Sequence, residues 1–248
     1  MNQDNFWCAS QYLDMIHDDA PETVVVTASP GDAPAAAIFD GMGGEQLGEH
    51  ASYLAATVFD ERYPDRFVED GCAFLDDVCR EANARICQHG VEINVSGNMG
   101  TTAAMILFGA KRVHIANVGD SRIYRMSGGR LTQISLDHSL ECPGRKKAPL
   151  TQFLGIPETE FVIEPYKATF PYKAGDRYLL CSDGLTDMVD EDAIASVLKS
   201  GDSVEETCAR LRDAALEGGG RDNVTVIVCE TAATRSRGLF AKWFKKEQ

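Results

Sequence analysis

Four aspartates stand where an apolar run meets a glycine-containing turn, and this repeated junction limits the folds that the chain can adopt. They are Asp40 in AIFDGMGG, Asp120 in ANVGDSR, Asp183 in YLLCSDGLTD and Asp222 in GGGRDNVTVIV. Each run has the length and the residue types of a buried strand. Because carboxylates that approach one another raise one another's pKa, a sheet end that gathers four of them needs a cation between them. We therefore expect strand ends that converge on a divalent-metal site.

The order of strand-like and helix-like segments favours an α+β fold. Apolar runs predict strands at 22–29, 35–40, 101–109, 112–118, 121–126, 160–169, 177–182 and 224–230. Helical periodicity predicts helices at 45–61, 70–88, 190–199 and 203–217, the last opened by a capping box of Ser203 and Glu206. A doubly wound parallel sheet would alternate strand and helix throughout, whereas the middle of this chain is strand-rich. We expect one domain over 1–233 with an antiparallel sheet core, followed by a short basic tail over 234–248.

The composition fits an ordinary globular domain and argues against several classes of protein. The 248 residues include 38 acidic and 24 basic side chains, which gives a formal net charge of −14. Such an acidic chain repels nucleic-acid phosphates, so nucleic acid is not an expected partner. The sequence has no apolar run of membrane-spanning length and no secretory signal pattern, so we expect a cytoplasmic protein. Its eight cysteines have no zinc-ligand spacing and are interpreted as reduced, packed thiols.

The residue types at the four junctions suit a hard cation. A carboxylate at a strand end, followed by a flexible glycine turn, can offer a side-chain oxygen and a main-chain carbonyl to one ion. Mg²⁺ and Mn²⁺ prefer such oxygen ligands, and the sequence has no clustered Cys and His that would select zinc. Asp and Gly also occur in strand-to-helix turns for structural reasons alone. The recurrence of the junction favours the metal-site interpretation.

Seven motifs follow one another along nearly the whole chain. They are NQD at 2–4, DGMGG at 40–44 with GEHAS at 48–52, GTT at 100–102, VGDSRIY at 118–124, LTQISLDHS at 131–139, LLCSDGLTD at 179–187 and GGRDNVTVIV at 219–228. In this order and spacing the chain resembles the PPM family of metal-dependent protein phosphatases, also called type 2C serine/threonine phosphatases, and DGMGG looks like the bacterial branch. The resemblance implies a four-layer fold in which pairs of helices flank both faces of a central antiparallel β-sandwich.

The resemblance also implies which residues form the catalytic centre. Asp40 would bridge two metal ions, Gly41 would offer its carbonyl oxygen to one of them, and Asp183 and Asp222 would complete the binuclear site. The implied cofactor is Mn²⁺ or Mg²⁺, and the three aspartates would act through a water that bridges the two ions. Such a mechanism needs no protein nucleophile, in keeping with a sequence that shows no nucleophile–base arrangement.

Two more carboxylates are assigned by the resemblance, and two family features differ. Asp4 matches the family's N-terminal acidic residue, a metal ligand or a neighbour of one, and Asp120 matches the residue that binds a third ion together with Asp183.

The family usually has an Arg that binds the substrate phosphate shortly before the NQD motif, and here that motif follows Met1 directly. Either an N-terminal piece is missing, which we favour, or metals and waters alone hold the phosphate. Met42 stands where some relatives have a His, so the leaving-group acid is unidentified.

We expect a monomeric serine/threonine protein phosphatase that acts on phosphorylated proteins in a pathway with a cognate Ser/Thr kinase. One alternative is a hydrolase of small phosphate esters. The other is a pseudophosphatase, a binding module without the chemistry. The missing Arg favours this last alternative, whereas the four intact junction aspartates oppose it.

The basic tail and the scattered histidines are interpreted more simply. Residues 236–248 (SRGLFAKWFKKEQ) have apolar side chains at helical spacing among lysines, which predicts a short amphipathic helix. We expect this helix to pack on the acidic body, and the alternatives are an acidic partner or weak contact with an anionic membrane. His138 is interpreted as a turn residue near the site, His50, His89 and His114 as surface or packing residues, and Cys72, Cys79 and Cys87 as one helix face.

Overall fold

The structure is a computed structural model that describes residues 2–17, 24–42, 47–66, 70–95, 97, 99–140, 148–232 and 239–244. The first sheet has the order β1 (Asp4–Cys8), β3 (Ala35–Met42), β5 (Ala103–Phe108), β6 (Arg112–Val118) and β9 (Tyr166–Pro171), and β4 (Gly100–Thr101) pairs with β3. The second has the order β2 (Val24–Ala28), β12 (Leu239–Phe244), β11 (Val226–Thr231), β10 (Arg177–Cys181), β7 (Arg122–Ser127) and β8 (Arg130–Gln133).

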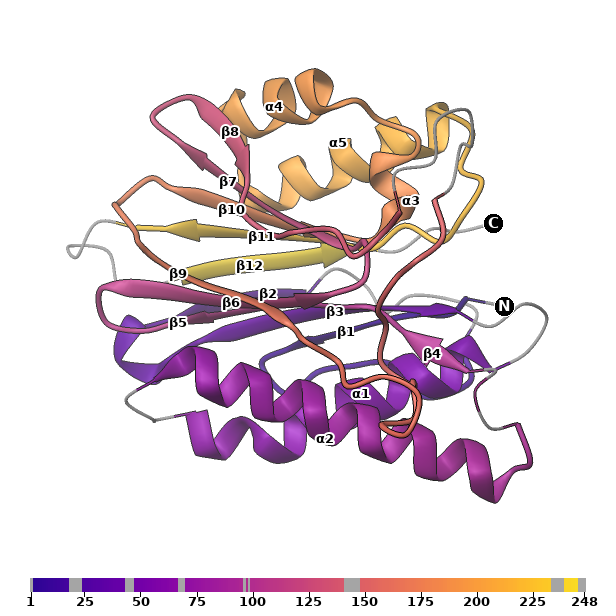
Figure 1. The fold of residues 1–248 in the computed structure, drawn as a ribbon. Helices are drawn as coiled ribbons and strands as arrows, with labels where there is room; N and C mark the ends of the chain where they lie inside the picture. The colour runs from indigo at the N-terminus through magenta and orange to yellow at the C-terminus, as the bar shows by residue number, and fades with distance from the viewer. Residues whose placement is uncertain are drawn as a thin grey trace.

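The two antiparallel sheets stack face to face, and helices cover their outer faces (Figure 1). The long helices α1 (Gly48–Arg62) and α2 (Gly71–Glu92) lie on the first sheet, and α4 (Glu191–Lys199) and α5 (Val204–Glu217) lie on the second. A single-turn helix, α3 (Asp183–Thr186), follows β10 directly. This is the four-layer α+β sandwich that the resemblance implies.

The alternation of side chains along β1 and β3 builds the core on both sides of the first sheet. Phe6 lies opposite Ile38, and both pack between the two sheets. The next residues, Trp7 and Phe39, point to the other face and pack against α1. The Trp7 ring lies 4.6 Å from the Phe59 ring of α1, and its indole N–H donates to the carboxylate of Asp60 at 2.9 Å. These contacts hold α1 on the sheet.

Most predicted elements form within a few residues of their expected limits, and the helix starts have clear causes. The capping box of α5 is present, because the Ser203 hydroxyl accepts the Glu206 N–H and the Glu206 carboxylate accepts the Ser203 N–H. The predicted strand at 160–169 is half wrong, since β9 begins only at Tyr166. Pro165 precedes it, and the apolar side chains of Phe161 and Val162 are exposed instead of paired in the sheet. Strands β1, β4 and β8 and helix α3 were not predicted.

The predicted tail helix is wrong. Residues 239–244 form strand β12, which pairs antiparallel with β11 on one side and β2 on the other. The helical spacing of the apolar residues is overridden because both edges of this segment find backbone partners, and aromatic residues favour strands. The amphipathic helix on which a membrane or partner contact would depend is therefore not formed, and residues 233–238 and 245–248 lie outside the described part of the chain. A domain boundary at residue 233 stays a prediction.

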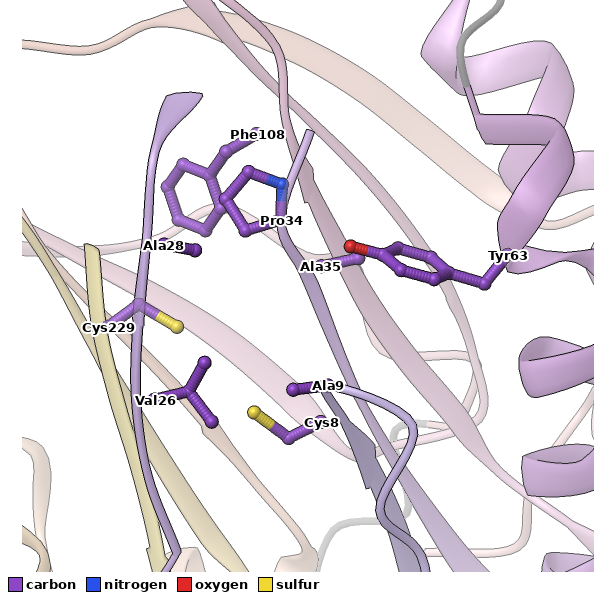
Figure 2. Close-up of a pocket in the computed structure, with 9 residues that line it drawn as sticks. All are labelled: Cys8, Ala9, Val26, Ala28, Pro34, Ala35, Tyr63, Phe108 and Cys229. Carbon is purple, nitrogen blue, oxygen red and sulfur yellow. The ribbon is translucent and has the colours of Figure 1, made fainter. Parts of the chain in front are cut away.

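The far end of the sandwich contains a small apolar cavity of about 50 Å³ (Figure 2). It lies beside the start of β3 and the end of β1, and the sulfur atoms of Cys8 and Cys229 point into it. Because β1 and β3 are antiparallel, this cavity is separated by the length of the strands from the end that carries Asp4 and Asp40. None of the helices in the described ranges is both long and apolar enough to cross a bilayer.

Candidate metal centre

Five predicted carboxylates come to one end of the sandwich from both sheets. Asp4 opens β1, and Asp40 lies near the end of β3. On the other side, Asp183 opens α3 directly after β10, and Asp222 lies four residues before β11. Asp120 stands in the turn that leads from β6 of the first sheet to β7 of the second. Figure 1 shows α3 and the start of β1 on the same side of the molecule.

The first two of these carboxylates continue a stripe of apolar core residues. Asp4 and Asp40 are cross-strand partners, as are Phe6 and Ile38 two positions further on. Since side chains alternate along a strand, the two aspartates share the inner face of the sheet with these core residues. The stripe that fills the space between the sheets thus ends in a pair of carboxylates.

The electrostatics of Asp40 show how closely the acidic groups gather. Removal from water raises the pKa of Asp40 well above its usual range, and the negative charges of Asp4, Asp183, Asp222 and Asp120 raise it further. All four of the other predicted carboxylates thus contribute to the raised pKa of Asp40. A group of acids with this mutual repulsion favours either bound protons or a bound cation.

Asp4 is the most enclosed of the group, with 2% of its surface exposed. Burial raises its pKa to about 6, hydrogen bonds from Thr225 and Ser182 oppose that rise, and the charges of Asp183 and Asp222 add to it. The two hydrogen bonds run from the Thr225 and Ser182 hydroxyls to Oδ2 of Asp4, at 2.6 and 2.9 Å. Ser182 also accepts the backbone N–H of Thr225 at 3.0 Å, so this hydroxyl pair joins the second sheet to β1 of the first.

The backbone of Asp40 is fixed by the GTT motif. Its N–H donates to the Thr102 hydroxyl at 3.1 Å, and its carbonyl accepts from the Thr101 hydroxyl and the Thr102 N–H, each at 2.9 Å. The Thr102 hydroxyl is in turn 2.7 Å from the hydroxyl of Ser121, in the turn that carries Asp120. The threonines thus connect the backbone at Asp40 with the neighbouring acidic turn.

Gly41 is placed where no side chain fits. A Cβ atom there would lie 2.2 Å from the Gly48 carbonyl oxygen and 2.4 Å from the Gln3 carbonyl oxygen. Its N–H donates to the same Gln3 oxygen at 3.1 Å. The end of β3 therefore passes in direct contact with the start of α1 and with the residue before β1. Gly43 and Gly44 of the same motif lie outside the described residues.

The turn at Asp120 is braced by His138. Nδ1 of this histidine accepts the Gly119 N–H at 3.2 Å, and its own backbone N–H donates to the Gly119 carbonyl at 2.9 Å. Burial lowers the pKa of His138, so the ring is neutral at neutral pH and can act as this acceptor. His138 is thus a turn residue beside the site, as predicted.

The site also contains polar residues that the sequence analysis missed. They are Ser182 and Thr225 at Asp4, Thr101, Thr102 and Ser121 at Asp40, and Asn223, whose side-chain oxygen accepts the Gln3 N–H at 2.9 Å. All of them lie inside the seven sequence motifs, but Ser, Thr and Asn are too common in turns to stand out by type. Ser121, Ser182 and Asn223 adjoin a predicted aspartate in the sequence, and that position is a signal that could have found them, whereas Thr101, Thr102 and Thr225 have no such signal.

The donor set fits Mg²⁺ or Mn²⁺ better than a thiophilic metal. The converging side chains offer carboxylate oxygens, which hard divalent ions prefer. Cys181 is near this end of the sandwich, but burial raises the pKa of its thiol to about 12, so it stays protonated. The residues that the sequence analysis assigned to metal binding therefore fit the ions that it assigned to them.

The family model for protein phosphatase 2C matches residues 14–218. Asp40, Asp120 and Asp183 lie inside this range, whereas Asp4 and Asp222 lie outside it, and only the fold places them beside the others. The matched range covers most of the chain, which settles family membership.

Two named relatives show similar matches. The chain is 38% identical over 205 residues to the serine/threonine protein phosphatase PstP of Mycobacterium tuberculosis, a match that spans 78% of the chain but 40% of the relative. It is 32% identical over 216 residues to the serine/threonine phosphatase stp of Listeria welshimeri, spanning 79% of the chain and 84% of the relative. The chain thus covers less than half of the mycobacterial protein and most of the listerial one.

A solved structure of the PstP catalytic domain, in complex with two manganese ions, is similar in fold. It superimposes with a TM-score of 0.71 over 97% of this chain and 99% of that one, at 31% sequence identity. The four-layer architecture described above is therefore shared with a protein whose crystal contains manganese.

Proposed function

Because this chain belongs to the protein phosphatase 2C family, we propose that it is a metal-dependent phosphatase of phosphoserine and phosphothreonine in proteins. The observation that carries the proposal is the convergence of the other four carboxylates on Asp40 at one end of the sandwich. The relatives named as serine/threonine phosphatases, and the manganese in the PstP catalytic domain, support the same assignment.

In this proposal Asp40, Gly41, Asp183 and Asp222 hold two Mn²⁺ or Mg²⁺ ions. When bound, the ions supply an activated water as the nucleophile and neutralise the charge of the phosphoryl oxygens. Asp120, together with Asp183, holds a third ion. The catalytic aspartates are Asp40, Asp183 and Asp222, and each would contribute anionic charge that holds the ions at this end of the sandwich.

Other residues keep these carboxylates in place. Asp4 is held by the Ser182 and Thr225 hydroxyls, so one of its oxygens has a fixed position and its charge lies beside Asp40. Thr101 and Thr102 fix the backbone on which Asp40 and Gly41 follow one another. Such preorganisation lowers the cost of gathering the ligands when the ions bind, because the side chains lose little further freedom.

We further propose a monomer that works in the cytoplasm on phosphorylated proteins, opposite a cognate Ser/Thr kinase. All seven described cysteines are free thiols, which supports a reducing compartment; the buried ones are Cys8, Cys79, Cys181, Cys208 and Cys229. The net charge of −14 argues against nucleic acid as a partner.

Hydrolysis of p-nitrophenyl phosphate and of a phosphothreonine peptide, each with Mn²⁺ and with excess EDTA, tests the proposal. We expect Mn²⁺-dependent turnover of both substrates and none with EDTA. Turnover of the aryl phosphate alone would favour the hydrolase of small esters. Binding of Mn²⁺ without turnover of either substrate would favour the pseudophosphatase.

A further inference from the structure

A second group of metal-ligand side chains lies outside the acidic centre, between α2 and the first sheet. It consists of Asp70, Cys72 and His114, whose ligand atoms all lie within 4.8 Å of one another. Asp70 is the N-cap of α2, Cys72 belongs to its first turn, and His114 belongs to β6. His114 alternates with Val113 and Ile115, which pack between the sheets, so its ring is on the face that α2 covers. The group is therefore on the opposite face of the sheet from Asp4 and Asp40.

The contacts within this group are direct. Sγ of Cys72 is 3.8 Å from Nδ1 of His114, and the Thr169 hydroxyl on β9 is 3.1 Å from the sulfur and 3.0 Å from the same nitrogen. Two ligands of a tetrahedral zinc ion, at ordinary Zn–S and Zn–N lengths, lie about 3.4–3.8 Å apart. The sulfur and the nitrogen are already at such a separation, and the Thr169 hydroxyl stands beside both.

The close approach of helix and ring is made possible by Gly71. A Cβ atom at this position would lie 2.7 Å from the His114 ring, so a side chain here would push the first turn of α2 off the sheet. Burial lowers the pKa of His114, which keeps the imidazole neutral and its nitrogen lone pair available at neutral pH. The helix start and the ring are thus held together before any ion binds.

We propose that Asp70, Cys72 and His114 form a binding site for a thiophilic divalent ion, with Zn²⁺ as the best fit. One sulfur, one imidazole nitrogen and one carboxylate oxygen are a zinc ligand set, and the fourth position is taken by water or the Thr169 hydroxyl. Binding releases the thiol proton of Cys72 to solvent, so two anionic ligands neutralise the charge of the ion. The bound ion ties the start of α2 to β6.

Cobalt serves as the probe, because Co²⁺ bound by a thiolate has a sulfur-to-metal charge-transfer absorption that an all-oxygen site lacks. The full chain is titrated with Co²⁺ in excess Mg²⁺, which occupies the acidic centre, and Zn²⁺ is then added. We expect the near-ultraviolet charge-transfer band to appear with Co²⁺ and to disappear when Zn²⁺ displaces it. Absence of the band in the wild-type protein would overturn the proposal.

Three variants locate the site, and two others are controls at cysteines outside it. Cys72→Ser should abolish the band, whereas Cys87→Ser and Cys142→Ser should keep it. His114→Gln and Asp70→Asn should weaken Co²⁺ binding about 10- to 100-fold. Asp70→Asn is the sharpest of these, because Asn caps a helix as well as Asp does and the hydrogen bond from the Cys72 N–H is retained. It keeps the test valid if Cys72→Ser folds poorly.

Two results would contradict this location. A charge-transfer band that persists in Cys72→Ser, or Co²⁺ affinity that is unchanged in both Asp70→Asn and His114→Gln, would show that the ion binds elsewhere. Hydrolysis of p-nitrophenyl phosphate with Mn²⁺ should be the same in all five variants, since none of these residues belongs to the acidic centre.

Discussion

Asp4 lies directly opposite Asp40 across the antiparallel pair β1 and β3, on the face of the sheet that packs against the second sheet. An apolar core would place hydrophobic residues at this position, as it does two residues further on with Phe6 and Ile38. The paired carboxylates therefore lower the stability of the metal-free fold. A cation bound between them would remove that destabilisation, so we expect metal binding and folding stability to be linked at this site.

Asp40→Asn and Asp183→Asn should each lower Mn²⁺-dependent hydrolysis roughly hundredfold or more, because each removes an anionic oxygen without a change of volume. The fold should stay intact, and the metal-free melting temperature should rise by about 2–4 °C for each kcal/mol of repulsion relieved. Steady-state rates and circular dichroism measure the two effects. Asp77→Asn, the same change at an exposed position on α2, is the control. Wild-type turnover in either site variant would refute the assignment.

Thr225→Val should weaken both the metal-free fold and the affinity for Mn²⁺. Valine has the same shape but lacks the hydroxyl that donates to Asp4 at 2.6 Å, and loss of a hydrogen bond to a charged group costs about 1.5–3 kcal/mol. Urea unfolding and calorimetry with Mn²⁺ measure the two quantities. Thr207→Val removes an equally buried hydroxyl from α5, away from the site, and should destabilise the fold without changing Mn²⁺ affinity. Equal Mn²⁺ affinity in both variants would exclude a positioning role for Thr225.

The metal-free protein should lose stability as the pH rises from about 4 to above 6. The pKa of Asp4 is about 6 in the folded state and near 3.8 when unfolded, so the folded state binds more protons across this interval and the free energy of unfolding falls with pH. Excess Mn²⁺ should reverse the trend, because it binds the deprotonated site. Melting temperatures in EDTA and in Mn²⁺ across this range check the prediction. An Asp4→Asn protein that retains the full pH dependence in EDTA would contradict it.

Asp120→Ala should spare the two tighter ions and remove the weaker one. The other four carboxylates keep their positions, since the backbone at Asp40 is held by Thr101 and Thr102. We expect Mn²⁺ calorimetry to lose its weak phase and kcat to fall while the tight phase is unchanged. A titration curve identical to that of the wild type would remove Asp120 from metal binding.

Removal of residues 233–248 should destabilise the protein. If these residues were a tail separate from the domain, their removal would leave its stability unchanged. The truncation deletes β12 and leaves the edges of β2 and β11 without the strand between them. We expect a lower melting temperature and concentration-dependent aggregation. Removal of residues 245–248 alone, which keeps β12, is the matched control. Equal stability of the two truncated proteins would support the predicted boundary at residue 233.

Four of the five acidic residues proposed for the site stand at a local landmark in the sequence. Asp40, Asp183 and Asp222 each adjoin an apolar run and a glycine, so the strand limits and the site residues follow from the same pattern. Asp4 has no such landmark. All five residues of β1 are buried, so the strand shows no alternation, and only the family motif points to Asp4.

The rest depends on contacts between distant segments. The hydroxyls of Ser182 and Thr225 reach Asp4 across more than 170 positions, and Ser and Thr carry no periodic signal. The β12 segment has helical spacing, and its two strand partners lie at opposite ends of the sequence. His114 and Cys72 become neighbours only because α2 packs on β6, so two residues interpreted as packing form a group with shared chemistry.

The strand order β2-β12-β11 in the second sheet also determines when its strands can pair during synthesis. In the described structure β2 pairs with β12 alone, whereas every strand of the first sheet lies between Asp4 and Pro171. A ribosome makes the chain from its N-terminus, so Val24–Ala28 emerges before every other strand except β1 and long before its partner Leu239–Phe244. The first sheet can assemble with α1 and α2 while synthesis continues. The edge strand β2 of the second sheet cannot pair until β12 has been synthesised. Until then this hydrophobic strand can bind chaperones or pair with the wrong strand.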